Sequence, residues 1–146
     1  NLHLGLSPYY RGSGTNYFPF VNGEPEYCGA TFMFLNDGID TGNIIHQIRP
    51  EIYRLDSFHQ LSNRFLIYAF KTYKKIVENI HKFKEYKIQT NLQNNNYKLF
   101  LRKDFTEDSV KNLYKNFSDK MLEKYISNKK YRDSKVPIFE QKFELK

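Results

Sequence analysis

The first 42 residues constrain the fold most strongly, because strand-like pieces alternate there with loops rich in turn-forming residues. The opening Asn-Leu-His is typical of the end of a strand, where side chains alternate, so Asn1 and His3 would share one face. The segment 6–14, Leu-Ser-Pro-Tyr-Tyr-Arg-Gly-Ser-Gly, cannot continue a strand. Asp40 lies in a second loop, Asp-Gly-Ile-Asp-Thr-Gly at 37–42. Polar side chains where strands pass into loops are expected at a functional site of an open α/β sheet.

The next elements follow from turn formers and apolar patterns. Residues 15–21 predict a short helix with Thr15 as its N-cap. Residues 29–35 carry apolar side chains on both faces, which indicates a strand buried in a covered sheet. Residues 43–49 predict the returning strand, closed by Pro50.

The second half of the sequence is read mainly as helical. Apolar residues spaced by three and four predict a long helix over 57–83, capped by Asp56 and packed on the core. A hairpin is expected from 86–93 and 97–102 across an Asn-rich turn. A second helix is expected over 107–129, capped by Thr106, and Pro137 is expected in an extended end.

Composition excludes several classes of protein. A single cysteine, Cys28, excludes an intramolecular disulfide and fits a reducing cytosol. No apolar stretch approaches the ~20 residues of a membrane span, so a cytoplasmic protein is expected. His46, His59 and His81 are too far apart for a metal-ligand motif, so no metal is expected.

The charge of +7 lies in the second half of the chain. Residues 1–70 carry 4 Arg, no Lys and 6 acidic residues, whereas residues 71–146 carry 19 basic and 10 acidic residues. A basic segment of this kind could bind tRNA. Because Lys and Glu are mixed and not blocked, a solvated surface is the preferred interpretation and nucleic-acid binding is not expected.

Together these motifs resemble the folate-dependent formyltransferases, a family that includes glycinamide ribonucleotide, methionyl-tRNA and sugar-amine formyltransferases. The family signature combines Asn-x-His-Pro-Ser-Leu-Leu-Pro-x-Tyr-Arg-Gly, Asn-Gly-Glu, a Gly-Thr/Val-Thr strand and Asp-x-Gly-x-Asp-x-Gly. This sequence has the corresponding pieces in the same order: Asn1-x-His3, Pro8-x-Tyr10-Arg11-Gly12, Asn22-Gly23-Glu24, Gly29-Ala30-Thr31 and Asp37-Gly38 leading to Asp40-Thr41-Gly42. Leu4-Gly5 replaces the usual Pro-Ser and Ser7 replaces a Leu, changes that bear on substrate choice more than on chemistry.

The resemblance implies a catalytic set of Asn1, His3 and Asp40. Formyl transfer from 10-formyltetrahydrofolate to an amine passes through an oxyanion, which needs hydrogen-bond donors, and a proton must leave the amine. The Asn1 amide would donate to the formyl oxygen, His3 would donate to the oxyanion and protonate the departing folate nitrogen, and Asp40 would orient the imidazole and take the amine's proton. Taken singly, a His at a strand end is usually structural and an Asp in such a loop is usually a turn former.

The resemblance also implies two binding regions. Tyr10, Arg11 and Gly12 would bind a phosphate or carboxylate of the substrate through the guanidinium, although a loop anchor is an equal alternative. The folate would contact the loop of Asn36, Asp37, Gly38 and Ile39, which turn geometry alone would also explain.

For the architecture, the resemblance implies an α/β fold: the C-terminal half of a formyltransferase, a Rossmann-like open sheet, with a helix-plus-hairpin tail. Residues 1–85 would be the C-terminal half of the catalytic domain and residues 86–146 a C-terminal extension. The expected partner is the missing N-terminal half of the same fold.

The predicted function is N-formyl transfer to a small-molecule amine, an amino sugar or sugar nucleotide. Three alternatives stay open. They are formyltetrahydrofolate hydrolysis by an attacking water, a methionyl-tRNA formyltransferase-like or RNA-binding module, and a non-catalytic remnant.

Overall fold

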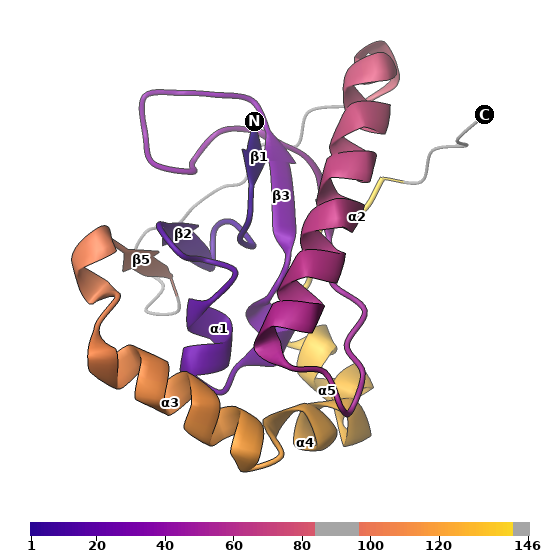
Figure 1. The fold of residues 1–146 in the computed structure, drawn as a ribbon. Helices are drawn as coiled ribbons and strands as arrows, with labels where there is room; N and C mark the ends of the chain where they lie inside the picture. Colours follow the sequence, from indigo (N-terminus) through magenta and orange to yellow (C-terminus); the bar gives the residue numbers. More distant parts are fainter. Residues whose placement is uncertain (84–96, 142–146) are drawn as a thin grey trace.

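The computed structural model describes residues 1–83 and 97–141 (Figure 1). Its central element is β3 (Ala30–Met33), which pairs antiparallel with β1 (Leu2–His3) on one side and with β4 (Ile44–Ile48) on the other. All four residues of β3 are buried, as expected for a strand with apolar residues on both faces. The strands predicted over 29–35 and 43–49 are therefore confirmed in shorter form.

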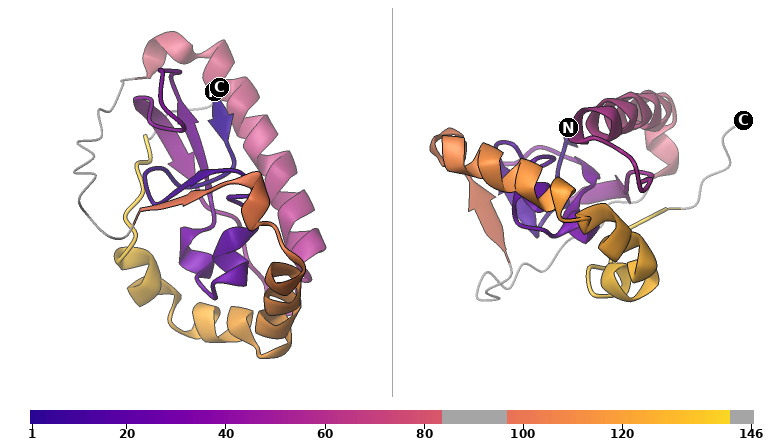
Figure 2. Two further views of the ribbon diagram at one scale, coloured as in Figure 1. Left: turned by 90° about the vertical axis from the view of Figure 1, so that its left-hand side faces the viewer. Right: turned by 60° about the horizontal axis from the view of Figure 1, so that its bottom comes forward.

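The long helix α2 (Phe58–Glu78) runs beside this sheet (Figures 1 and 2). One hydrophobic cluster joins its buried face to the sheet: Ala30, Phe32, Ile45, Ile48, Phe65, Ala69 and Ile76. The helix predicted over 57–83 is thus confirmed but ends earlier, and a short 3₁₀ turn, η2 (Ile80–Lys82), follows it. The expected apolar stripe is only partly core, since Val77 is 53% exposed.

The N-cap of α2 is Ser57, so the prediction of Asp56 was wrong. Ser57 accepts a hydrogen bond from the backbone N–H of Gln60, and the Gln60 side chain accepts from Ser57 N in a capping box. Asp56 instead accepts from Tyr53 N at 2.8 Å and pairs with Arg64 at 2.5 Å. Its carboxylate therefore fixes the loop before the helix.

A second sheet joins distant parts of the chain. β2 (Tyr10–Gly12) pairs in parallel with β5 (Lys98–Phe100), in the register Tyr10 to Lys98 and Gly12 to Phe100. The expected first hairpin arm, 86–93, lies outside the described residues. The second arm, 97–102, is a strand only over β5, which is bonded to β2.

Short helices surround one end of the molecule (Figure 2). They are α1 (Phe18–Val21), η1 (Pro25–Tyr27), η3 (Arg102–Asp104), α3 (Glu107–Ser118), α4 (Met121–Ser127) and α5 (Lys129–Ser134). The helix predicted over 15–21 begins later because Thr15 is no cap: its hydroxyl donates to Leu4 O at 2.8 Å. Thr106 caps α3 as predicted. The helix predicted over 107–129 is broken, since Lys120 has a left-handed φ of 60° that an α-helix cannot accommodate.

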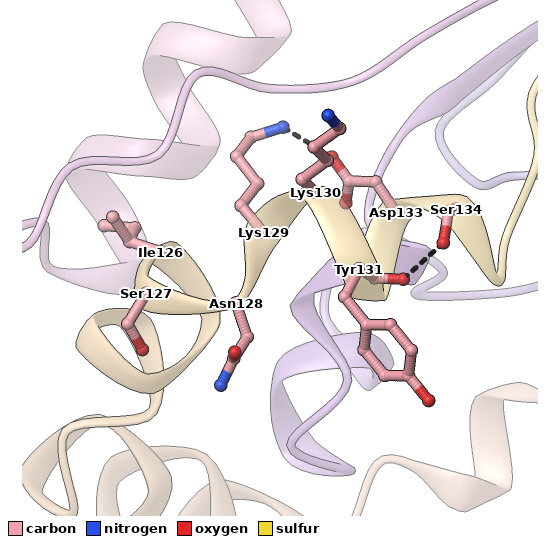
Figure 3. A pocket seen from close by; sticks show the side chains of 8 residues that line it. All are labelled: Ile126, Ser127, Asn128, Lys129, Lys130, Tyr131, Asp133 and Ser134. Atoms are coloured by element: carbon pink, nitrogen blue, oxygen red, sulfur yellow. Dashed lines mark hydrogen bonds and ion pairs between the residues drawn. The ribbon is translucent and has the colours of Figure 1, made fainter.

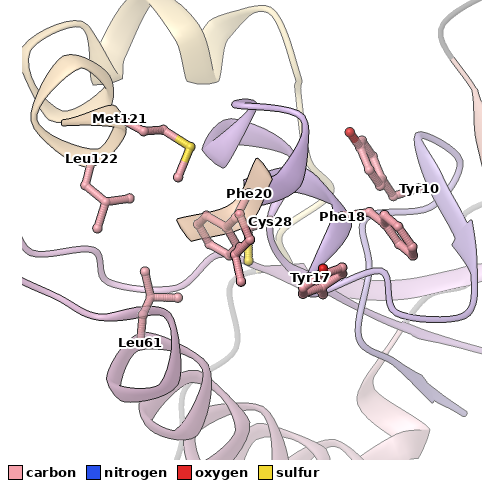
Figure 4. Packing of buried hydrophobic residues seen from close by; sticks show 9 residues of the cluster. Tyr10, Tyr17, Phe18, Phe20, Cys28, Leu61, Met121 and Leu122 are labelled. Carbon is pink, nitrogen blue, oxygen red and sulfur yellow. The ribbon is translucent and has the colours of Figure 1, made fainter. Parts of the chain in front are cut away.

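The second hydrophobic cluster unites both halves of the sequence (Figure 4). It contains Tyr10, Tyr17, Phe18, Phe20, Cys28, Leu61, Leu113, Met121 and Leu122. Burial raises the pKa of the Cys28 thiol, which therefore stays neutral as a small apolar group.

The chain then returns to the first sheet. Beyond Pro137 it is extended, as predicted, and lies beside β4, where Gln47 N donates to Phe139 O at 2.7 Å and Phe139 N donates to Gln47 Oε1 at 2.9 Å. Among residues 1–83 and 97–141, no helix combines the length and apolar character needed to cross a membrane.

Candidate active site

His3 and Asp40 form a buried pair. Nδ1 of His3 lies 3.3 Å from Oδ1 of Asp40, and the two side chains are only 6% and 15% exposed. His3 ends β1, whereas Asp40 lies in the loop between β3 and β4 with a left-handed φ of 52°. Asp adopts this backbone conformation more readily than most residues. The structure thus brings two of the three predicted catalytic residues together.

The backbone of β2 binds both members of the pair. Nε2 of His3 lies 2.9 Å from the carbonyl oxygen of Tyr10, and Gly12 N donates to Oδ2 of Asp40 at 2.7 Å. Because a carbonyl oxygen only accepts, Nε2 carries the hydrogen in this contact. Nδ1, the other ring nitrogen, faces Oδ1 of Asp40.

The loop after His3 is held close to the ring. A Cβ at Gly5 would lie 2.5 Å from Nε2 of His3 and 2.6 Å from Cβ of Thr15, so only glycine fits here. The carbonyl oxygen of Gly5 accepts from Oγ1 of Thr31 at 2.7 Å. The departure Leu4-Gly5 therefore lets the chain pass directly beside the imidazole.

Buried polar groups fix the other end of this loop. Ser7 N donates to Oγ1 of Thr31 at 3.0 Å, and Nε2 of Gln47 donates to Ser7 O at 2.8 Å. The Ser7 hydroxyl donates to the backbone oxygen of Asp40 at 3.1 Å. Ser7, Thr31 and Gln47 thus tie the loops of His3 and Asp40 to the sheet.

The predicted folate loop is exposed and built as a tight turn. Oδ1 of Asn36 accepts from Gly38 N at 3.1 Å and from Oγ1 of Thr41 at 2.9 Å. Asp37 and Ile39 are also exposed. A Cβ at Gly42 would lie 1.7 Å from Phe34 O, so the loop can close only with glycine there. Asn36, Asp37, Gly38 and Ile39 therefore form a surface beside Asp40.

The predicted substrate-binding residues form β2 itself. Nε of Arg11 is buried and has no hydrogen-bond partner among the described residues. The Tyr10 side chain turns away into the core, where burial raises the pKa of its phenol and its hydroxyl donates to Oε2 of Glu24 at 2.5 Å. Gly12 contributes its N–H to Asp40. Of the three residues, only Arg11 keeps a side-chain donor without a partner in residues 1–83 and 97–141.

Asn1 directly precedes β1. Its backbone N donates to Met33 O at 2.8 Å, while its side chain is exposed and makes no hydrogen bond within the described part of the chain. Its amide is thus free to meet a ligand.

Sequence reasoning gave no role to Gly5, Ser7, Thr31, Gln47 or β5. Thr31 belongs to the motif Gly29-Ala30-Thr31, and Gly5 and Ser7 are departures from the family pattern. β5 lies within the predicted arm 97–102, but its pairing with β2 carries no local signal, because it joins distant parts of the chain. No group of three or more His, Cys, Asp or Glu side chains in residues 1–83 and 97–141 could hold a metal.

A separate hollow lies on α4 and α5 (Figure 3). Its lining includes Lys129, which pairs with Asp133 at 2.5 Å, and Ser134, whose hydroxyl donates to Tyr131 O. It contains none of the predicted site residues.

The sequence matches known proteins over its first part. The model of the formyl transferase family covers residues 1–80. The methionyl-tRNA formyltransferase of Desulforamulus reducens is 35% identical over 85 residues, which are 58% of this chain and 26% of the relative. That of Bacteroides thetaiotaomicron is 35% identical over 80 residues, which are 55% of this chain and 24% of the relative. The chain thus spans about a quarter of these relatives.

Solved structures extend the likeness to most of the chain. An N-formyltransferase from Helicobacter canadensis, solved with folinic acid and dTDP-3-aminofucose, has a TM-score of 0.63 and 28% identity, over 80% of this chain and 46% of its own. WlaRD, a sugar 3N-formyl transferase solved with dTDP and 5-N-formyl-THF, has a TM-score of 0.62 and 30% identity, over 80% of this chain and 45% of its own. The predicted formyltransferase-type α/β fold is therefore confirmed, over less than half of those chains.

Proposed function

Because the chain belongs to the formyl transferase family, we propose that the protein carrying it transfers a formyl group from 10-formyltetrahydrofolate to an amine of a small molecule, an amino sugar or sugar nucleotide. The observation that carries the proposal is the buried pair of His3 and Asp40 on the backbone of β2. In the reaction the amine nitrogen bonds to the formyl carbon, and the bond from that carbon to the folate nitrogen breaks.

His3 would serve the developing negative charge on the formyl oxygen. Its Nε2–H faces a carbonyl acceptor, Tyr10 O, at 2.9 Å. On substrate binding the formyl oxygen would accept a hydrogen bond from this Nε2–H, which Tyr10 O holds in position before the ligand arrives. One hydrogen bond donated to an oxyanion commonly raises the rate by a factor of roughly 10²–10³. The same ring would then protonate the departing folate nitrogen.

Asp40 would act on both sides of the reaction. Its Oδ1 lies 3.3 Å from Nδ1 of His3, which orients the imidazole. Its carboxylate would also receive the proton lost by the amine, through a water. The exposed amide of Asn1 would add a second donor to the formyl oxygen.

The exposed loop from Asn36 to Ile39 supports a binding site for the formyl donor, the folate. It lies next to Asp40, and its backbone is fixed by the Asn36 side chain. The structures of the Helicobacter canadensis and WlaRD enzymes contain folinic acid and 5-N-formyl-THF. A formyl-folate bound along this loop would bring its formyl group towards Asp40 and His3.

Arg11 supports a binding site for the formyl acceptor, a nucleotide-linked amine. Its buried, unpaired Nε lies one residue from the carbonyl that holds His3 and one residue from the amide that holds Asp40. A guanidinium binds phosphate oxygens through a planar fork, so the diphosphate of a nucleoside-diphosphate sugar is a fitting ligand. The Helicobacter canadensis enzyme was solved with dTDP-3-aminofucose and WlaRD with dTDP.

The test is an assay of the full-length protein with 10-formyltetrahydrofolate and a set of dTDP- and UDP-linked amino sugars. Formation of the formamide and of tetrahydrofolate in equal amounts is the expected result. Tetrahydrofolate formed without formamide would instead show hydrolysis. Neither product with any amine would contradict the proposal.

A second candidate is a methionyl-tRNA formyltransferase. It is favoured by the curated relatives, which carry that name at 35% identity. Charged initiator tRNA belongs in the same assay as a competing acceptor. Formylation of the tRNA alone, with a steep loss of activity at higher salt, would favour this second function.

A further inference from the structure

β2 is hydrogen-bonded along both edges, and the two edges serve different partners. One edge holds the reactive pair, through Tyr10 O to His3 and Gly12 N to Asp40. The other edge holds β5: Lys98 N donates to Tyr9 O at 2.8 Å, and Ser13 N donates to Phe100 O at 2.9 Å. Any shift of β2 against β5 would therefore move the acceptor of His3 and the donor of Asp40 together.

From this arrangement we propose that β5 positions His3 and Asp40 for catalysis, with Lys98 as its positioning residue. The inference rests on the proposed function, because it gives these two residues their catalytic roles. Lys98 lies outside residues 1–80, which the family model matches. It touches neither member of the pair and would act through Tyr10.

Lys98 clamps the side chain of Tyr10. Its Nζ lies 2.5 Å from Oε2 of Glu24 and 3.2 Å from the Tyr10 hydroxyl, and it stands 5.2 Å from the centre of the Tyr10 ring. The same hydroxyl donates to Glu24 at 2.5 Å and accepts from Nδ2 of Asn22 at 2.9 Å. Three polar groups thus fix one end of Tyr10, whose carbonyl oxygen holds His3.

Phe100 completes the clamp at the other end of β5. Its ring stacks on Tyr10 at 5.4 Å and on Phe18 at 4.0 Å between centroids. A Cβ at Gly12 would lie 2.1 Å from Phe100 O, so the backbones approach as closely as glycine allows. The residue that binds Asp40 is therefore fixed by direct backbone contact with β5.

The ion pair itself adds little to folding stability. The Lys98 and Glu24 side chains are 36% and 32% exposed, and pairs this accessible to water are weak. Loss of the ammonium should therefore change the geometry of β2 more than the stability of the protein. Small displacements of a catalytic group can lower turnover strongly.

The experiment compares Lys98→Met with Lys74→Met in the full-length protein. Lys74 pairs with Glu78 at 3.8 Å on the exposed face of α2, so the control also removes one lysine and one surface ion pair. We expect Lys98→Met to lower kcat about tenfold, with the KM for the folate donor and the melting temperature unchanged. Amide exchange at Gly12 N–H should be faster, and Lys98→Arg should restore both kcat and exchange.

Each outcome separates the inference from the proposed function. Unchanged kcat and unchanged Gly12 exchange in Lys98→Met, in a protein that transfers formyl groups, would overturn the positioning role. Faster Gly12 exchange that Lys98→Arg reverses, in a protein without formyl transfer, would refute the proposed function while supporting the clamp. If Lys98→Met does not fold, Glu24→Gln removes the same ion pair. The kcat and the Gly12 amide exchange of that variant then test the positioning role.

Discussion

His3 and Asp40 are held against one another by the backbone of one short strand. The ring nitrogen and the carboxylate oxygen that face each other are 3.3 Å apart, and the opposite atoms of both side chains bond to β2. Two backbone atoms, Tyr10 O and Gly12 N, thus fix the two side chains, which have little freedom to move. The site is arranged before any ligand binds, which is what electrostatic catalysis requires.

The first prediction concerns the pair itself. His3→Ala and Asp40→Asn should each lower the formylation rate of the full-length protein by at least ~10²-fold, because one removes the oxyanion donor and the other the charge that orients it. Steady-state kinetics and a thermal melt give the two readouts. His59→Ala, at an exposed position of α2, is the control. Near-normal turnover in either site variant would remove that residue from the catalytic set.

The second prediction concerns Gly5. Gly5→Ser introduces the residue that the family signature has here, yet its Cβ would meet Nε2 of His3 at 2.5 Å. We expect kcat to fall more than tenfold, since the ring must move. Gly23→Ala is the matched control. It has no atom within 3.4 Å of its Cβ but a φ of +70°, so it should cost about 1 kcal/mol of stability and no activity. Equal activity of the two variants would contradict the close approach.

The third prediction concerns Arg11. Arg11→Met should raise the KM for a nucleotide-linked acceptor at least tenfold, because the loss of a guanidinium removes a charge-assisted contact to phosphate. The KM for the folate donor should stay within twofold of wild type. Arg54→Met removes an exposed arginine and serves as the control. If the acceptor KM is unchanged and only the melting temperature falls, Arg11 is a loop anchor.

The fourth prediction concerns pH. Burial lowers the pKa of His46 from 6.5 to about 4, so the unfolded chain binds this proton at a higher pH than the folded protein does. The free energy of unfolding should therefore decrease as pH falls from about 6.5 to about 4, by roughly 3 kcal/mol from this residue. Urea unfolding at pH 7 and pH 4.5 measures the change.

His46→Asn keeps an acceptor for Gln141 N, which His46 Nδ1 accepts at 3.0 Å, but does not titrate. This variant should lose most of the His46 contribution to the pH dependence. His59→Asn, on the surface, should keep it. Identical pH dependence in wild type and His46→Asn would show that His46 is not buried as described.

Local sequence signals were sufficient where neighbouring residues decide the structure. The apolar residues on both faces of 29–35 are those of a buried strand, and the spacing along α2 is that of a helix packed on a sheet. The cap at Thr106 was likewise readable, because its hydroxyl serves an N–H three residues ahead. These features depend on short-range geometry, which a sequence displays directly.

Other features depend on contacts that no local pattern displays. Thr15 has the chemistry of a cap, but its hydroxyl is taken by Leu4 O. Lys120 interrupts the expected long helix with a left-handed backbone conformation, which a lysine in the sequence does not predict. The support of His3 by Tyr10 O and Gly5 was not predictable, because it uses main-chain atoms and the absence of a Cβ.

The parallel pairing of Tyr10 with Lys98 also has a consequence for the time order of folding. A ribosome has already released the sequence of β1, β3, β4 and α2 when β5 emerges. The first sheet can therefore form while β2 still lacks its partner. Contacts between such distant segments close late, since the loop entropy must be overcome first. The nascent chain would thus form its first sheet well before it acquires a competent centre.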